Sequence, residues 1–201
     1  MLIHAHDQAP DDGAWRRFAT DQGFGHLVAS GRGRDTAVVV PTQYVVRPDD
    51  VILHLARPNP VWAAIEENSK VVLSVAGDWA YIPAAWKAIG VEDPTMGVPT
   101  TYYAAVQIEG TAEVVDEPDQ IAEILRLQIG EFEPNSDIAD PAQHTGKLRA
   151  IRGLRITIDE VRAKFKYGGN VDSDHRAAIA ARLAERSNPG DASARSHIAD
   201  R

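Results

Sequence analysis

The chain has 201 residues, of which 44% are hydrophobic and 25% are charged, so it is long enough to bury one sizeable core. The absence of cysteine excludes disulfide bonds, thiolate metal sites, iron–sulfur clusters and a cysteine nucleophile. A formal net charge of −8 opposes broad, phosphate-driven binding of nucleic acid, which is normally carried by a basic face.

The first residues, Met1 to Asp7, lack the basic start and the apolar run of a signal peptide. No stretch approaches the roughly 20 apolar residues that a membrane span needs. We therefore expect a cytoplasmic protein that has no membrane partner.

The amino-terminal part of the chain predicts one helix followed by strands. Asp11 and Asp12 begin a helix that carries Trp15 and Phe18 on one face and ends near Gly23. Apolar and β-branched runs then alternate with clusters of turn-forming residues. These runs predict strands over residues 24–30, 36–46 and 51–56.

The middle of the chain predicts two more strands around a short helix. Asn59 and Pro60 place a capping residue before a proline at the first helical position, so a helix is expected up to about Asn68. Strands are expected over 70–76 and 100–115, with a shorter extended piece over 80–83. The segment 87–98 is rich in glycine and proline and predicts an irregular loop.

The remaining chain predicts helices on either side of further strands. Apolar residues at helical spacing indicate a helix over 116–130 and a weaker one over 142–151, and Asp172 begins a last helix. Period-two alternation predicts strands within 154–167. From Asn188 onward the residues are polar and small, which predicts a disordered tail over 188–201.

The order of these elements predicts a mainly β fold. About six antiparallel strands joined by hairpins, with no alternation of strand and helix, indicate a closed β-barrel with helical appendages. We expect a single domain over residues 1–187 that carries inserted and C-terminal helices.

Three cations alternate along the last predicted strand. Arg162, Lys164 and Lys166 share one face, while Phe165 and Tyr167 point the other way. Like charges this close favour a bound anion, such as the phosphate or carboxylate of a cofactor. A run of this kind is also typical of a solvated strand face, and the residues alone leave both interpretations open.

A second group of candidates lies at the ends of strands. Arg57 follows a strand and Asn59 precedes a helix. The guanidinium and the free backbone N–H groups at the start of the helix together predict a phosphate-binding site. His54 stands alone, and a lone histidine is more often a hydrogen-bonded structural residue than a ligand. Thr100 and Tyr102 begin the longest strand, where a hydroxyl and an aromatic ring are suited to flank a planar ring.

Other motifs carry less information. His4 and His6 put two imidazoles on one strand face, but no third ligand follows at a diagnostic spacing, and we assign them no role. No phosphate-binding loop, zinc-protease motif or helix-turn-helix pattern is present in the sequence.

Several segments stand in an order that is specific as a set. They are His54-Leu55-Ala56-Arg57-Pro58-Asn59-Pro60-Val61-Trp62, Ala80-Tyr81-Ile82-Pro83 with Trp86, Val98-Pro99-Thr100 with Tyr103-Ala104-Ala105-Val106, Gly110-Thr111-Ala112, and Lys164-Phe165-Lys166 with Asn170. This set resembles the PaiB-like family, also described as FMN-binding negative transcriptional regulators.

The resemblance implies an FMN-binding split barrel that works as a homodimer, with FMN at the subunit interface. It places Arg57 near the phosphate, and Thr100 and Tyr102 near the ring. It also implies that two lysines of the last strand close the pocket. The predicted cofactor-binding residues are His54, Arg57, Asn59, Thr100, Tyr102, Lys164 and Lys166. No catalytic residue is assigned.

The sequence departs from the family pattern at two places where ring contacts are expected. Family members are expected to read Trp-Asn after the Pro-Thr pair, and this chain has Thr101-Tyr102. The pattern Lys-Leu-Ser-Gln-Asn appears here as Lys166-Tyr167-Gly168-Gly169-Asn170. Three alternatives stay open: the flavin is held differently, another cofactor is held, or none is.

Two main functions follow from these alternatives. The first is a negative transcriptional regulator or flavin-dependent redox sensor, although the negative net charge of the chain opposes direct contact with DNA. The second is a flavin- or haem-dependent enzyme on the same barrel. A related branch resembles haem enzymes of the piperazate-synthase type, which form a nitrogen–nitrogen bond, and His54 stands where their iron ligand is. A cofactor-free dimeric scaffold is the third alternative.

Overall fold

The computed structural model describes residues 1–88 and 93–199. Contacts divide these residues into two compact units, which are described separately. Unit 1 comprises residues 1–18, 76–106 and 162–201, and unit 2 comprises residues 19–75 and 107–161. The assignment of one domain over residues 1–187 stays a prediction. Within the described part of the chain, no helix has both the length and the apolar character to cross a membrane.

Seven strands form one sheet in the order β2-β1-β5-β6-β7-β4-β3. Their bounds are β1 Phe24–Ala29, β2 Val38–Gln43, β3 Val45–Val46, β4 Asp50–Ala56, β5 Lys70–Ile82, β6 Thr100–Val115 and β7 Ile151–Lys166. The pairs of β1 with β2 and β5, and of β4 with β3 and β7, are antiparallel. The mainly antiparallel fold with helical appendages is therefore confirmed.

The expected closure of the barrel is wrong, because the sheet has two free ends. β2 and β3 stand at opposite ends of the strand order, and no pairing joins them among the residues that the structure describes. Only Tyr44 separates these two strands in the sequence. The chain itself therefore connects the two ends, where hydrogen bonds would close a full barrel. The Tyr44 hydroxyl is buried and donates to the Ala19 carbonyl at 2.7 Å, which fixes the position of Tyr44 between the two strands.

The helices are α1 Asp12–Gln22, α2 Val61–Glu67, α3 Ala84–Lys87, α4 Pro118–Phe132, α5 Thr145–Leu148, α6 Ser173–Arg186 and α7 Asp191–Ala199. Short 3-10 turns cover Ala5–Asp7, Pro94–Met96 and Pro141–Gln143. The weaker helix expected over 142–151 is reduced to α5, because β7 already begins at Ile151. In the expected loop 87–98, residues 89–92 lie outside the described residues.

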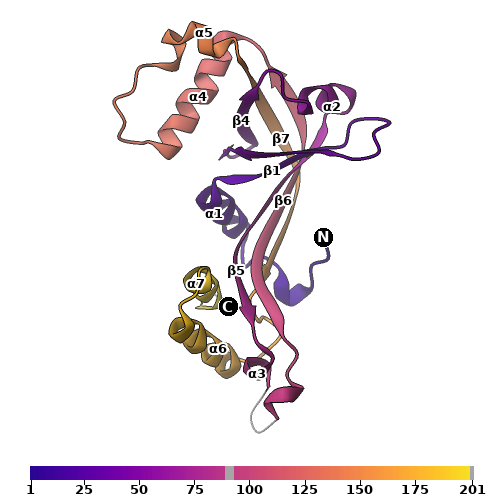
Figure 1. Ribbon diagram of the computed structural model, residues 1–201, viewed down its shortest axis with the longest axis vertical. Coiled ribbons are helices and arrows are strands. Elements are labelled where there is room, and N and C mark those ends of the chain that lie inside the picture. Colours follow the sequence, from indigo (N-terminus) through magenta and orange to yellow (C-terminus); the bar gives the residue numbers. More distant parts are fainter. Residues whose placement is uncertain (89–92, 200–201) are drawn as a thin grey trace. The chain divides into compact units, whose positions relative to one another are not determined.

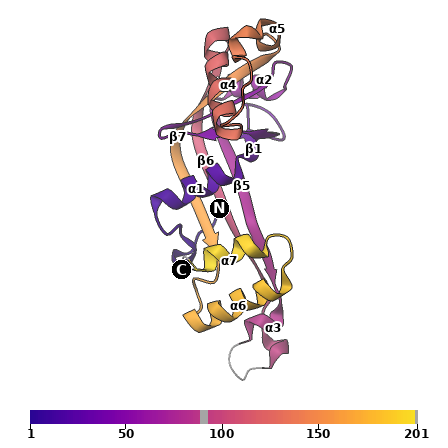
Figure 2. The same cartoon turned by 90° about the vertical axis from the view of Figure 1, so that its left-hand side faces the viewer.

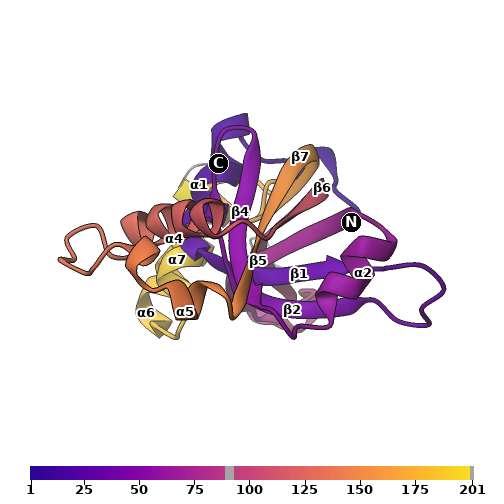
Figure 3. The ribbon, with the colours of Figure 1, turned by 90° about the horizontal axis from the view of Figure 1, so that it is seen from above.

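The core of unit 2 lies between α4 and the strands β3 and β4. α4 carries Ile121 and Ile124 on its buried face, and these residues pack with Val45 and Ile52 of the sheet. Gly153 of β7 permits this close approach, since a Cβ there would lie 2.6 Å from Ile124 Cδ1. Figure 2 shows α5 at one end of α4, and Figure 3 shows α2 beside β1 and β2.

In unit 1, α6 and α7 lie side by side (Figure 1). The Asp172 side chain accepts from the His175 backbone N–H at 2.8 Å and so caps α6 as predicted. The prediction of a disordered tail over 188–201 is wrong for α7. The buried Asp191 pairs with Arg186 at 2.6 Å, and Ile198 of the same helix is also buried, so tertiary contacts order a segment whose composition is polar.

Candidate cofactor site

A cavity of about 360 Å³ in unit 1 brings together four of the seven predicted site residues. These are Thr100, Tyr102, Lys164 and Lys166. The other residues that line the cavity are His4, His6, Asp7, Lys87, Val98, Pro99, Gly168 and Asn170. Its size lies within the range of small-molecule sites.

The strands β6 and β7 explain why these side chains meet. Lys164 and Lys166 are two residues apart on β7, so both side chains stand on the same face. Thr100 is the first residue of the neighbouring strand β6, and its Oγ1 accepts a hydrogen bond from Lys166 Nζ at 2.7 Å. The third cation of the predicted face, Arg162, does not line the cavity.

Lys164 is buried, so a solvated strand face does not describe it. Its Nζ donates to the Leu2 carbonyl at 3.1 Å and lies 3.5 Å from a carboxylate oxygen of Asp7, which is also buried. A buried ammonium of this kind is stable only with a partner nearby. The amino-terminal segment therefore supplies the counter-charge for the strand.

The cavity carries an excess of positive charge. Lys87, Lys164 and Lys166 line it, whereas Asp7 is its single carboxylate among the described residues. Burial and, to a smaller extent, the charge of Lys166 lower the pKa of Lys87. A bound anion would relieve the repulsion between these ammonium groups and offset the cost of burying them.

Tyr102 presents a buried hydroxyl that has no hydrogen-bond partner among residues 1–88 and 93–199. Burial raises the pKa of this phenol to about 12, so it is a neutral donor at pH 7. Gly168 lies against it with φ at +77°, and a Cβ on Gly168 would overlap Tyr102 Oη. The orphaned hydroxyl and the excess charge both fit an anionic, oxygen-bearing cofactor.

Several cavity residues were not assigned to the site from the sequence. Lys87 stands at the border of an irregular segment, where no periodicity indicates which way a side chain points. His4 and His6 were seen as a pair, and their rings do stack, with centroids 5.3 Å apart. No cluster of three or more metal-binding side chains was found in the part of the chain that the structure describes. The charge of the lining, with three lysines and one carboxylate among the described residues, suits an anion.

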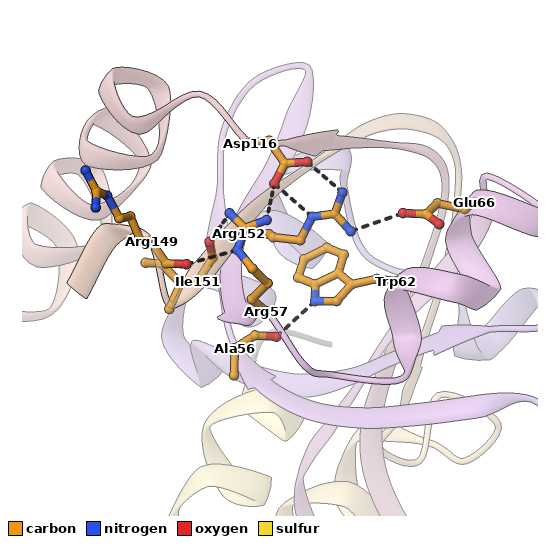
Figure 4. Close-up of polar contacts among 8 residues, drawn as sticks. All are labelled: Ala56, Arg57, Trp62, Glu66, Asp116, Arg149, Ile151 and Arg152. Atoms are coloured by element: carbon orange, nitrogen blue, oxygen red, sulfur yellow. Dashed lines mark hydrogen bonds and ion pairs between the residues drawn. The ribbon is translucent and has the colours of Figure 1, made fainter. Parts of the chain in front are cut away.

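The other three predicted residues lie in unit 2, and Arg57 is engaged there in a network of its own (Figure 4). Its guanidinium donates to Asp116 Oδ1 at 2.9 Å and to the carbonyls of Arg149 and Ile151 at 3.0 and 3.1 Å. Arg152 approaches the other side of Asp116, at 2.6 Å. The hydrogen bond from Arg152 is the largest cause that lowers the pKa of Asp116.

This network joins the ends of three strands and one helix. Arg57 follows β4, Asp116 follows β6, and Arg152 lies at the start of β7. Arg152 also reaches Glu66 of α2 at 3.1 Å, and its guanidinium lies 5.3 Å from the centre of the Trp62 ring (Figure 4). The predicted phosphate-binding site is thus also a structural junction between these strands and the helix. The role of Arg57 in binding phosphate stays a prediction.

Asn59 and His54 are also engaged within unit 2. Asn59 Oδ1 accepts from the Val61 backbone N–H at 3.0 Å, so this side chain satisfies the start of α2. His54 Nδ1 lies 2.6 Å from Oε1 of the buried Gln128 on α4. Because an amide oxygen only accepts, Nδ1 donates this hydrogen bond, and in the neutral ring Nε2 is then the nitrogen that carries the lone pair.

Residues 1–160 match the model of the family described as "Putative FMN-binding domain". The chain belongs to this FMN-binding domain family. The same family resemblance appears in a curated relative, the protease synthase and sporulation protein PAI 2 of Bacillus subtilis (strain 168). That protein is 26% identical over 180 residues, which are 86% of this chain and 84% of the relative. The PaiB-like resemblance is thereby confirmed.

Solved structures support the fold of this FMN-binding domain chain. The FAD and haem binding protein from Mycobacterium smegmatis has a TM-score of 0.65 at 17% identity, over 86% of this chain and 79% of that chain. The flavocytochrome Anf3 from Azotobacter vinelandii has a TM-score of 0.62 at 18% identity, over 84% and 73%. At these identities the likeness establishes the split-barrel fold alone.

Proposed function

We propose that this protein is a flavoprotein that holds FMN and serves as a redox-responsive regulator. The single observation that carries the proposal is the cavity of unit 1, where three lysines, one of them buried, and an unpartnered phenol hydroxyl suit an anionic, oxygen-rich ligand. Membership of the FMN-binding domain family supports the identity of that ligand. The acidic net charge favours regulation through a small molecule or a protein over direct contact with DNA.

The residues of the cavity have separate tasks in this proposal. Lys164 and Lys166 hold the anionic part of FMN, and Thr100 fixes the orientation of Lys166 through the hydrogen bond to its Nζ. The carboxylate of Asp7, 3.5 Å from Lys164 Nζ, holds this side chain in place. FMN, when bound, supplies the capacity to accept and return electrons, which no side chain of this cysteine-free chain offers.

We also propose that the protein is a cytoplasmic homodimer, as the family resemblance implies, with the cofactor at the interface between subunits. Regulation of transcription belongs to this proposal too. The relative PAI 2 is named as a sporulation protein, which supports a regulatory role. Two copies would give a redox-dependent surface with two-fold symmetry, the commonest arrangement among homo-oligomers.

Haem is the second candidate, and one observation favours it. Gln128 fixes the tautomer of His54 so that Nε2 is free to ligate iron, which is how a hydrogen-bonded neighbour usually prepares a histidine ligand. One structural relative is named as a FAD and haem binding protein and another as a flavocytochrome. Here haem would support an enzyme, such as a piperazate-synthase-like catalyst.

The absorption spectrum of the purified protein, followed by titration with FMN, tests the proposal. Flavin bands are expected, and Lys166→Gln should weaken FMN binding roughly tenfold because it removes a charged donor. The matched control is Lys147→Gln, which removes the same charge from an exposed site on α5. A Soret band that disappears in His54→Ala would favour haem. Equal FMN affinity in both lysine variants would contradict the proposed site.

A further inference from the structure

The two departures from the family pattern lie against each other in the structure. Tyr102 stands where the pattern has Asn, and Gly168 stands where it has Ser. A Cβ on Gly168 would overlap Tyr102 Oη, and φ of Gly168 lies in the left-handed region. The hydroxyl of Tyr102 therefore occupies the space that a side chain at position 168 would need. Tyr102 and Gly168 are therefore in contact in the wall of the cavity.

Tyr102 brings a hydrogen-bond donor to the wall of the cavity, and this donor has no acceptor among the described residues. Tyr102 is fully buried, its Oη has no partner in the described ranges 1–88 and 93–199, and its raised pKa keeps the proton in place. A buried donor left unpaired is costly, and native structures rarely keep one without a purpose.

The neighbouring cavity side chains do not supply the acceptor. Lys87, Lys164 and Lys166 are donors only. The Thr100 hydroxyl already accepts from Lys166, and the carboxylate of Asp7 lies beside Lys164. His4, His6 and Asn170 also carry possible acceptors, but no described residue lies within hydrogen-bonding reach of Tyr102 Oη, so a ligand with an acceptor oxygen would supply the missing partner.

We propose that Tyr102 Oη donates a hydrogen bond to an oxygen of the bound ligand and is a specificity-determining residue of the cavity. This inference rests on the proposed binding of FMN. A ligand that lacks an oxygen at this place leaves the phenol unpaired and is rejected, which is a strong basis for discrimination between ligands. On FMN the oxygen belongs either to the phosphate or to the part that riboflavin shares with FMN, which is a carbonyl of the ring or a hydroxyl of the ribityl chain.

Titration of the wild-type protein and Tyr102→Phe with FMN and with riboflavin tests the inference. FMN is expected to bind the variant about tenfold or more weakly. If the oxygen belongs to the phosphate, riboflavin binds both proteins equally. If the oxygen belongs to the ring, riboflavin is weakened as well. Equal FMN affinity in Tyr102→Phe and wild type would overturn the inference and leave the proposed function intact.

The thermal stability of the ligand-free protein separates a binding role from a structural one. Tyr102→Phe is expected to keep or raise Tm, because it removes an unpaired buried hydroxyl. The matched control is Tyr44→Phe, whose hydroxyl donates to the Ala19 carbonyl and whose loss should lower Tm and leave FMN affinity unchanged. A lower Tm for Tyr102→Phe would also overturn the inference. A wild-type protein that binds neither flavin would overturn the inference and the proposed function together.

Discussion

Gly168 of unit 1 is a residue at which one added carbon atom is disfavoured for two reasons. Its φ of +77° disfavours any residue with a Cβ, and that Cβ would also meet the hydroxyl of Tyr102. Two separate penalties, backbone strain and overlap, therefore fall on a single position. The penalty from overlap depends on the tyrosine hydroxyl, whereas the penalty from strain does not.

Gly168→Ala should lower the free energy of unfolding by about 1–3 kcal/mol through strain and overlap together. In a Tyr102→Phe background the cost should be smaller, because the hydroxyl that the Cβ meets is gone. Urea unfolding of the four proteins in this cycle measures both values. Gly146→Ala is the control, since a Cβ there meets nothing within 4 Å. Equal costs in the two backgrounds would contradict the contact.

At the scale of elements, the junction around Asp116 joins α2 to the ends of β4, β6 and β7. Arg57 and Asp116 are both 44% exposed, so the ion pair between them contributes little by itself. The hydrogen bonds from Arg57 to two backbone carbonyls also hold its guanidinium in a fixed position. This explains why an arginine with a predicted ligand role is also held by the fold.

Arg57→Ala and Asp116→Asn separate these two roles of Arg57. If Arg57 binds the phosphate of FMN, the alanine variant loses flavin, whereas the asparagine variant keeps the guanidinium and retains flavin. Asp116→Asn also removes a carboxylate whose pKa is lowered in the folded state. The wild type has its stabilising contribution above the unfolded pKa of about 3.9 and loses it as pH falls through the lowered folded pKa, whereas the variant lacks it at every pH. Flavin content and unfolding at pH 3 and pH 7 measure both effects. Equal flavin loss in the two variants would contradict a direct contact with phosphate.

Period-two and helical patterns predicted the elements that bury one regular face. β6 was expected over 100–115 and is observed there, and the helix expected over 116–130 corresponds to α4. The sequence pattern did not predict the extent of an element where that extent depends on tertiary contacts. β5 continues to Ile82 past Asp78, whose φ is +51°, and the Tyr167 hydroxyl donates to the Asp78 carbonyl at 2.9 Å. The sequence alone does not reveal a partner 89 positions away.

The candidate site was predictable to a similar extent. Alternation along β7 predicted that Lys164 and Lys166 share one face, and both line the cavity, whereas only the family resemblance put Thr100 in the same site as these lysines. The burial of Lys164 was not predictable, because it depends on Asp7 at the other end of the chain. Lys87 was missed for a different reason, because it ends the four-residue helix α3, which is too short to give a periodicity from which to orient a side chain.

At the scale of the whole molecule, four predicted site residues belong to unit 1 and three to unit 2. The family match over residues 1–160 includes parts of both units. That all seven residues serve one cofactor, in one dimer, stays a prediction. The acidic chain nevertheless concentrates positive charge in one cavity, which is the distribution expected of a protein that selects a small anion and repels polyanions.

Sedimentation velocity of the full chain with added FMN, recorded at a flavin absorption band, tests the central claim most directly. Free FMN barely sediments, so any flavin absorbance that moves with the protein reports binding. The account predicts a flavin boundary that moves with a species of about twice the mass of one chain. Flavin absorbance that stays with the free cofactor while the protein sediments would contradict it.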